Sequence, residues 1–225
     1  KVIRKLLYRS DGRGYLEDGF SHLFVLPAAG GTARQVTSGD FNHSGPQWMP
    51  DGRSLVFSAN RHEDWEHQPR NSEIYAVDLT SGEITALTDR EGPDGNPVVS
   101  PDGHRIAYLG FDDRYQGYQV TRLYLMDRDG RDGSLVTADL DRDVEDPQWS
   151  DDGRGLFFRF DDRGNTKVGL GTLDGEVSVL AGDVGGLSLG RPYAAGAYSV
   201  ADDGTVAFTL SRPEFPADVA VGRIG

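Results

Sequence analysis

Short runs of alternating apolar and polar residues follow one another along the whole chain, with turn residues between them. The clearest example spans residues 46–58, where an apolar run, the turn residues Asp51 and Gly52, and a second alternating run succeed each other. This order predicts two antiparallel strands joined by a tight hairpin turn, for which Asp-Gly is a favoured pair. No segment of ten or more residues has the periodicity of an amphipathic helix. The pattern therefore predicts a nearly all-β protein.

The same hairpin returns at nearly constant intervals. Its turn recurs at Asp102, Asp152 and Asp203, so successive turns are separated by 51, 50 and 51 residues. A period of about fifty residues with four strand-like runs per repeat is typical of a β-propeller, in which each repeat forms one four-stranded antiparallel blade. We therefore predict a β-propeller of about five blades, three complete and two partial, as an arc of a larger propeller. Trp48 and Trp149 share one position of the repeat and are expected to pack between blades.

The strand pattern divides the chain into five blades. Complete blades are predicted at residues 39–88, 89–138 and 139–182, and partial blades that lack one strand at residues 1–38 and 183–225. Strands are expected at residues 5–9, 21–26 and 32–37; 46–49, 53–59, 72–78 and 83–88; 97–100, 105–111, 122–127 and 134–137; 147–150, 155–160, 167–172 and 176–180; and 197–201, 205–210 and 218–222.

Strand direction alternates in such sheets, so the loops between the second and third strands lie on the face opposite the Asp-Gly turns. Two of these loops, residues 60–71 and 112–121, are long and rich in aromatic and charged residues. Variable loops on a rigid scaffold are where binding residues are usually found. We therefore look for function on this face.

These two loops carry the candidate substrate contacts. In the first loop, Glu63 or Glu66 could pair with the amino terminus of a short peptide, and Trp65 could pack on its side chain. In the second loop, Arg114 and Tyr115 could meet a carboxylate or a carbonyl group. In the alternative interpretation, the two aromatic residues only hold their loops in place and the charged groups face water.

Composition excludes several classes of function. The formal charge of −13 argues against a nucleic-acid partner, which requires a basic face. No run of eighteen apolar residues is present, so no membrane-spanning segment is predicted. The absence of cysteine removes disulfides, thiolate metal sites and cysteine nucleophiles, and it leaves the compartment open. The chain begins within a strand-like run and without a signal-peptide pattern, so we expect it to be part of a longer protein.

One motif matches the nucleophile of a serine hydrolase but lies in the wrong context. Residues 186–190, Gly-Leu-Ser-Leu-Gly, fit G-x-S-x-G, which requires a preceding strand and a following helix. Arg-Pro-Tyr follows instead. All five histidines also precede Ser188, whereas the hydrolase order places the catalytic histidine after the serine. We therefore assign no catalytic residue and expect no peptidase activity from this chain alone.

Three segments contain residue types that bind metals, but their spacing is wrong. The acidic segments do not match the glycine and glutamate positions of an EF-hand loop, and the histidine-containing segment has no helical spacing. We predict neither a metal site nor another cofactor. The segments are Asp127, Asp129 and Asp132; Asp139, Asp141 and Asp143; and His62, Glu63, Asp64, Glu66 and His67.

The repeated phrase at residues 147–153, Pro-Gln-Trp-Ser-Asp-Asp-Gly, resembles the repeat of TolB-type propellers and of the propeller domains of the prolyl oligopeptidase family. Residues 60–75 and 110–119 are similar to phrases of the acylaminoacyl-peptidase and dipeptidyl-peptidase branch of that family. The resemblance implies a propeller that covers an α/β-hydrolase domain and restricts the entry of large substrates. It also implies that the parent protein is a serine peptidase, with its own hydrolase domain and short peptides as partners.

Two functions stay open. The chain is either the non-catalytic propeller of a serine peptidase, which gates and positions short peptides, or a TolB-like periplasmic propeller that binds a protein. The peptidase interpretation requires roughly 250 further residues that hold a true G-x-S-x-G motif followed by Asp and His. In either case the first and last strands are expected to be open edges that can pair with another copy of the chain.

Overall fold

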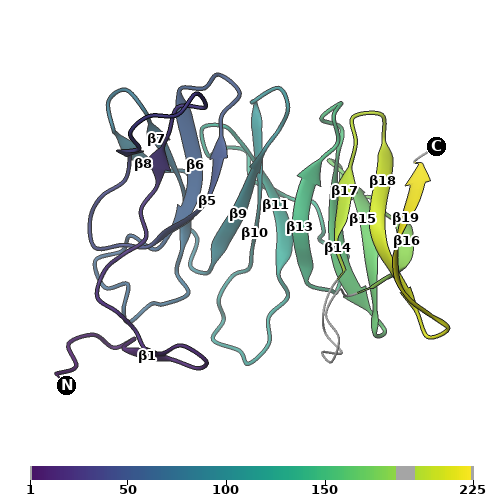
Figure 1. Cartoon of the computed structure of the whole chain (residues 1–225), viewed down its shortest axis with the longest axis horizontal. Helices are drawn as coiled ribbons and strands as arrows, with labels where there is room; N and C mark the ends of the chain where they lie inside the picture. Colours follow the sequence, from purple (N-terminus) through teal and green to yellow (C-terminus); the bar gives the residue numbers. More distant parts are fainter. Residues whose placement is uncertain (1, 186–195, 224–225) are drawn as a thin grey trace. The chain divides into compact units, whose positions relative to one another are not determined.

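The computed structural model describes residues 2–185 and 196–223, and every regular element in these ranges is a β-strand (Figure 1). The chain divides into two compact units, residues 1–97 with 112–114, and residues 98–111 with 115–225. No helix in the described ranges is long and apolar enough to cross a membrane. The strands are β1 (Arg9–Ser10), β2 (Gly14–Tyr15), β3 (Phe24–Val25), β4 (Arg34–Gln35), β5 (His43–Trp48), β6 (Ser54–Ala59), β7 (Glu73–Asp78), β8 (Ile84–Ala86), β9 (Asp94–Val99), β10 (Arg105–Gly110), β11 (Arg122–Asp127), β12 (Ser134–Leu135), β13 (Val144–Trp149), β14 (Gly155–Asp162), β15 (Asn165–Thr172), β16 (Val177–Val184), β17 (Tyr198–Val200), β18 (Thr205–Arg212) and β19 (Phe215–Arg223).

Three sets of four consecutive strands form antiparallel meanders. Their orders are β5-β6-β7-β8, β9-β10-β11-β12 and β13-β14-β15-β16. Strand β18 joins the last of these sheets through a single residue pair, Val184 with Leu210, and itself pairs with β17 and β19. The predicted all-β fold of four-stranded antiparallel propeller blades is confirmed.

The first strand of each complete blade begins three residues earlier than predicted. Each of these strands contains a proline at the same repeat position, residues 46, 97 and 147. The residue before this proline has a left-handed backbone in all three blades: φ is 60° at Gly45, 49° at Asn96 and 50° at Asp146. In β5 and β13 the pairing register shifts at this point, as in a β-bulge. A bulge breaks the alternation of apolar and polar residues, which is why the pattern hides the first half of each strand.

The N-terminal partial blade is less regular than predicted. Strands β3 and β4 pair at the centres of the two strands expected at residues 21–26 and 32–37. Of the strand expected at 5–9, only Arg9 lies in a strand, and it pairs across the turn at Asp11 and Gly12. This segment is therefore held mainly by loop contacts.

A threonine after the last strand of each of the first three blades extends the sheet. Its hydroxyl oxygen accepts the backbone N–H of a residue at the start of the third strand, which the short fourth strand leaves unpaired. The pairs are Thr37 with Leu23 (2.9 Å), Thr88 with Ile74 (2.9 Å) and Thr137 with Leu123 (3.0 Å).

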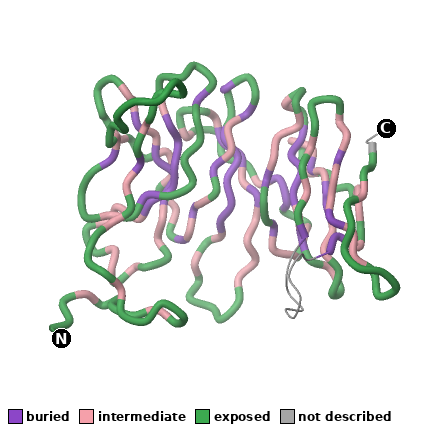
Figure 2. The backbone as a smooth tube through the Cα atoms, in the orientation of Figure 1, coloured by how far each residue is buried: buried purple, intermediate pink, exposed green. Residues whose placement is uncertain are grey.

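Each unit has its own apolar core, and buried residues follow the strands while the loops are exposed (Figure 2). In the first unit the core contains Phe57, Tyr75 and Val77, with two rings stacked at 5.7 Å. In the second unit Phe158 and Leu156 are fully buried at its centre. These cores hold rigid sheets from which the loops project.

The two repeat tryptophans differ in their surroundings. Trp149 packs against the core of the second unit and donates its indole N–H to the carbonyl oxygen of Val98 at 3.1 Å, as the prediction of packing between blades requires. Trp48 is 52% exposed, so the same prediction is wrong there.

Candidate functional site

Two of the predicted substrate-binding residues hold the N-terminal segment of the first unit. The ring of Trp65 meets the ring of Phe20 edge-on, with centroids 5.9 Å apart. Oε1 of Glu66 accepts the backbone N–H of Leu6 at 3.2 Å, and Lys5 lies 4.5 Å above the Phe20 ring. The loop at 60–71 therefore has an intramolecular partner on its surface.

The other predicted residues are exposed. Glu63 belongs to the same loop and faces solvent. Arg114 is exposed in the first unit, whereas Tyr115 belongs to the second unit, where it is 75% exposed with a left-handed φ of 54°. The structure thus brings Glu63, Trp65 and Glu66 together on one loop, and the loop at 112–121 is divided between the two units.

The first unit also contains a buried polar cluster that the sequence analysis missed. The side chains of Glu73 and Asp94 are among its most buried, at 2% and 0% exposure. The hydroxyl of Thr88 donates to Oε2 of Glu73 at 2.5 Å, and Arg90 forms an ion pair with Asp94. Nε2 of His62, on the loop at 60–71, lies 3.5 Å from Oε1 of Glu73. The cluster connects this loop to the sheet.

Hydrogen bonds fix the loops around the cluster. The amide group of Asn71 donates to Nε2 of His62 at 3.1 Å, and its oxygen accepts the N–H of Gly92 at 3.0 Å. Because an amide nitrogen can only donate, Nε2 is the acceptor and the neutral ring carries its proton on Nδ1. The hydroxyl of Ser58 donates to the carbonyl oxygen of Asp94 at 2.6 Å. The imidazole is therefore held in one orientation.

Segment 112–114 is tied to the same cluster. Arg90 lies 3.6 Å from Asp112, and Arg70 pairs with Asp113 at 3.0 Å. The backbone N–H of Asp113 also donates to the carbonyl oxygen of Glu91. The two loops that the sequence singled out are thus linked by ion pairs within one compact unit.

Burial controls the protonation of the cluster. It raises the pKa of Glu73 to about 7; the hydrogen bond from Thr88 opposes this shift, whereas the neighbouring Asp94 carboxylate adds to it. Burial also raises the pKa of Asp94, although the Arg90 guanidinium opposes the shift. Glu73 can therefore exchange a proton near neutral pH, beside an imidazole that is 35% exposed. Such a group can bind an amine or transmit a protonation change to its loop.

The described residues offer no metal centre. Within residues 2–185 and 196–223, no three His, Cys, Asp or Glu side chains are arranged to hold a metal ion. The G-x-S-x-G motif at residues 186–190, with the three residues that follow it, lies outside the described residues. The described side chains of the cluster can take part in ion pairing, hydrogen bonding and proton exchange.

Comparison with known proteins agrees with the fold and the repeat. Residues 12–108 match the family model of the dipeptidyl peptidase IV (DPP IV) N-terminal region. The chain is 30% identical over 114 residues to dipeptidyl-peptidase 5 of Porphyromonas gingivalis, which covers 49% of the chain and 16% of that protein. It is 31% identical over 120 residues to the acylamino-acid-releasing enzyme of Sus scrofa, which covers 49% of the chain and 15% of the enzyme. The chain is a homologue of peptidase propellers.

This homologue of the DPP IV N-terminal region also shares its fold with TolB. The structure of TolB from Acinetobacter baumannii superposes with a TM-score of 0.62 and 21% identity over 90% of the chain and 46% of TolB. The chain spans only about one sixth of the two peptidase relatives. The family match includes the loop at 60–71 and the buried cluster, but it ends before Arg114.

One signal in the sequence could have revealed the buried cluster. His43, Asp94 and Val144 occupy the same repeat position at the start of β5, β9 and β13, and all three are buried. A carboxylate at a repeat position that holds valine in another blade indicates a buried charge that needs a partner. Glu73 gives no comparable signal, because the equivalent positions of other blades are also polar.

Proposed function

We propose that this chain is the propeller region of a serine peptidase of the prolyl oligopeptidase type, which restricts entry and positions short peptides for a separate α/β-hydrolase domain. The match of residues 12–108 to the DPP IV N-terminal region carries this proposal. It is supported by the similarity to two peptidases that act on the ends of peptides according to their names. The chain supplies the scaffold and the binding loops, and the hydrolase domain supplies the nucleophile.

The loops of the first unit would provide the contacts. Glu63 is exposed, so its carboxyl group can pair with the amino terminus of a peptide. Trp65 and Glu66 contribute by holding the N-terminal segment beside it. Arg114, on the part of the loop at 112–121 that belongs to this unit, would meet a carbonyl or carboxylate group of the same peptide. The buried Glu73 and His62 would fix the loop from below its surface.

The test compares the chain with its full-length parent. Aminoacyl-nitroanilide and N-acyl-peptide substrates should be hydrolysed by the parent and not by residues 1–225 alone. The parent reading frame should contain roughly 250 residues after Gly225, with G-x-S-x-G followed by Asp and His. Turnover by the chain alone, or no turnover by the parent, contradicts the proposal.

Substitution in the parent tests the role of Glu63. Glu63→Gln should raise KM for peptides with a free amino terminus and leave KM for N-acylated peptides unchanged. Glu83→Gln is the matched control, because Glu83 is also exposed but lies in the turn between β7 and β8. An equal effect of both substitutions, or an equal effect on both substrate types, would argue against an amino-terminal contact.

A TolB-like protein-binding module is the second candidate. The repeated phrase at residues 147–153, which resembles that of TolB-type propellers, supports this candidate, and the superposition with TolB over 90% of the chain agrees with it in fold. A parent reading frame that ends soon after Gly225, or one with a secretory signal and no hydrolase domain, favours this function. Peptide hydrolysis by the parent would exclude it.

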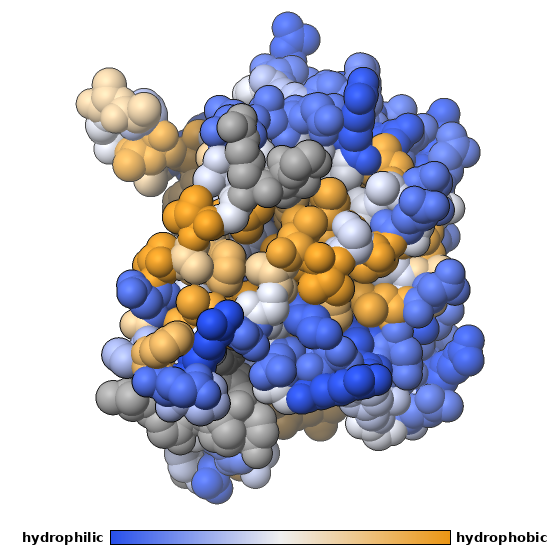
Figure 3. All heavy atoms as spheres, turned by 90° about the vertical axis from the view of Figure 1, so that its right-hand side faces the viewer, coloured by the Kyte–Doolittle hydropathy of each residue, from blue (hydrophilic) through white to orange (hydrophobic). Residues whose placement is uncertain are grey.

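We also propose that the open edge of the second unit can pair with a second copy of the chain. Among the described strands, β19 pairs only with β18. Figure 3 shows an apolar area on this side of the molecule. Its exposed apolar side chains on β16 and β19 are Val177, Val179, Phe215, Val219 and Val221. An open edge beside exposed valines favours strand addition.

A further inference from the structure

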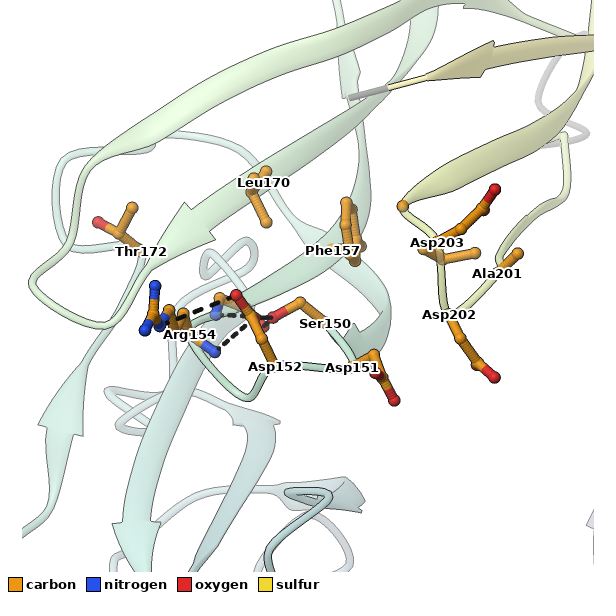
Figure 4. A pocket seen from close by; sticks show the side chains of 13 residues that line it. Ser150, Asp151, Asp152, Arg154, Phe157, Leu170, Thr172, Ala201, Asp202 and Asp203 are labelled. Atoms are coloured by element: carbon orange, nitrogen blue, oxygen red, sulfur yellow. Dashed lines mark hydrogen bonds and ion pairs between the residues drawn. The ribbon is translucent and has the colours of Figure 1, made fainter. Parts of the chain in front are cut away.

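A pocket of about 420 Å³ opens between the fourth blade and the β17–β18 hairpin of the second unit. Its apolar lining includes Phe157 on β14, Leu170 on β15 and Val200 on β17. In Figure 4, Phe157 and Leu170 lie toward the strands, whereas Asp151 and Asp202 lie toward two neighbouring turns. We call this space the inter-blade pocket. Its volume is within the range of small-ligand sites.

The pocket lies at a repeat position that holds a small side chain in this blade. Trp48 and Trp149 occupy the position in the second and fourth blades, whereas Val99 and Val200 occupy it in the third and fifth. At the junction before the fourth blade, the indole of Trp149 packs against the core and donates its N–H to the carbonyl oxygen of Val98. Valine fills much less volume than tryptophan, so the junction before the fifth blade has less side-chain volume at this position than the junction before the fourth.

The repeat also changes at the mouth of the pocket. In the second and third blades the residue before the Asp-Gly pair is proline, Pro50 and Pro101, whereas in the fourth and fifth blades it is Asp151 and Asp202. Both of these aspartates line the pocket. The two aspartates thus add negative charge at the opening of the pocket.

The aspartates of the Asp-Gly pairs differ in their contacts from the aspartates that precede these pairs. Oδ1 of Asp152 accepts the N–H of Arg154, and Oδ1 of Asp203 accepts the N–H of Thr205, each at 3.0 Å, so these carboxylates build their turns. Asp151 and Asp202 are exposed and make no hydrogen bond or ion pair with the described residues. Four carboxylates and one guanidinium, that of Arg154, line the pocket. The mouth therefore attracts a cation.

We propose that the inter-blade pocket binds an aromatic cation, with the ring against Phe157, Leu170 and Val200 and the ammonium group between Asp151 and Asp202. The apolar walls match an aromatic ring, and the carboxylates match the positive charge of the ammonium group. A free aromatic amine and a peptide with an aromatic residue next to lysine share this chemistry. The site lies at the Asp-Gly turns and does not depend on the proposed peptidase function.

Calorimetric titration with tryptamine tests the proposal on the whole chain. Tryptamine should bind, and its affinity should fall as salt is added, since exposed ion pairs are screened. Indole-3-propionate has the same ring with a negative charge, and butylamine has the charge without the ring. Both should bind at least about tenfold more weakly, which corresponds to roughly 1.4 kcal/mol. Equal binding of indole-3-propionate would overturn the proposal.

Variants locate the site. Val200→Trp introduces the side chain that the fourth blade has at this position and should abolish tryptamine binding while the Tm is kept or raised. Asp151→Asn and Asp202→Asn should each weaken binding about two- to fivefold, the usual effect of one exposed ion pair. Asp129→Asn changes the net charge equally at an exposed turn away from the pocket and should have no effect. The proposed site is refuted if the Asp202→Asn and Val200→Trp proteins bind tryptamine as tightly as the unsubstituted chain. It is also refuted if Asp129→Asn weakens tryptamine binding as much as Asp202→Asn does.

A second titration distinguishes the source of the ligand. N-acetyl-Trp-Lys-amide carries the ring and the cation of a polypeptide segment. Binding as tight as that of tryptamine indicates a peptide segment as the occupant, and binding of tryptamine alone indicates a free amine. If neither compound binds, the proposal is wrong.

Discussion

The hydroxyl of Thr88 donates to Oε2 of Glu73 at 2.5 Å while its oxygen accepts the N–H of Ile74 at 2.9 Å. The equivalent threonines of the neighbouring blades, Thr37 and Thr137, also accept a backbone N–H. Only in this blade is the residue before the accepted N–H a buried acid. In the other two blades the threonine hydroxyl only extends the backbone pairing of the sheet. In this blade the Thr88 hydroxyl also holds the carboxyl group of Glu73, whose protonation state affects the stability of the fold.

The free energy of unfolding should fall as the pH rises from about 4.5 to above 7. Burial raises the pKa of Glu73 to about 7 from 4.5, so the folded state binds more protons than the unfolded state in this window. The contribution of Glu73 to the free energy of unfolding is complete below the pKa of this group in the unfolded chain. As the pH rises through the pKa of Glu73 in the folded protein, the free energy of unfolding falls by roughly 2–3 kcal/mol. Urea unfolding at pH 5 and pH 8 measures this difference.

Glu73→Gln should remove most of that pH dependence, because glutamine resembles the protonated acid and does not ionise. Part of the dependence should stay, since the pKa of Asp94 is also raised. The exposed Glu63→Gln variant should behave like the unsubstituted protein. If the free energy of unfolding of the Glu73→Gln protein depends on pH as strongly as that of the unsubstituted protein, the carboxyl group of Glu73 is not the source of the pH dependence.

Trp149→Phe should destabilise the protein, whereas Trp48→Phe should not. Phenylalanine keeps a ring but removes the N–H that Trp149 donates to Val98, which leaves a carbonyl without its partner. We expect a loss of about 1–2 kcal/mol at position 149 and a change within about 0.5 kcal/mol at the exposed position 48. Chemical denaturation of both variants provides the comparison, and equal losses would mean that the hydrogen bond contributes nothing.

Trp65→Ala should loosen the N-terminal segment without unfolding the sheets. The edge-on contact between Trp65 and Phe20 is of a kind that contributes about 0.5–1.5 kcal/mol. Trypsin should therefore cut in residues 4–13 about two- to tenfold faster than in the unsubstituted chain. Trp48→Ala removes an exposed indole without such a contact and serves as the control. If both variants are cut at the same rate, Trp65 does not anchor the segment.

The double substitution Val219→Lys and Val221→Lys should reduce self-association. Both valines are 68% exposed on the open strand β19, where lysine places charge against an incoming strand. Sedimentation velocity over a range of concentrations should show less dimer. Asp129→Asn with Asp139→Asn makes the same change in net charge, from −13 to −11, at a distant surface and should leave association unchanged. A monomeric unsubstituted chain would contradict the proposed edge pairing.

The repeat made most of the strands predictable from sequence. Asp-Gly turns and two-residue alternation are local signals, so the strands at residues 53–59, 105–111 and 122–127 were located within one residue at each end. The bulges at Gly45 and Asp146 were hidden because one extra residue inverts the alternation.

The site was less predictable because its contacts join residues that are distant in sequence. Glu73 meets Thr88, 15 residues later, and Glu66 meets Leu6, 60 residues earlier. The sequence correctly indicated a loop rich in charge and aromatic rings, but not that Trp65 has Phe20 as a partner. The inter-blade pocket combines the small side chain of Val200 with Asp151 and Asp202, and only a comparison of the repeats with one another discloses this combination.

The left-handed residue before each repeat proline separates two halves of a strand. Residues after it keep the alternation that the hairpin turn imposes, and residues before it follow the loop that precedes the blade. An insertion or deletion in that loop can be absorbed at this single residue, so it does not turn the core-facing side chains outward. The loops that precede the blades of this chain can thus change length over evolution while the sheets stay the same.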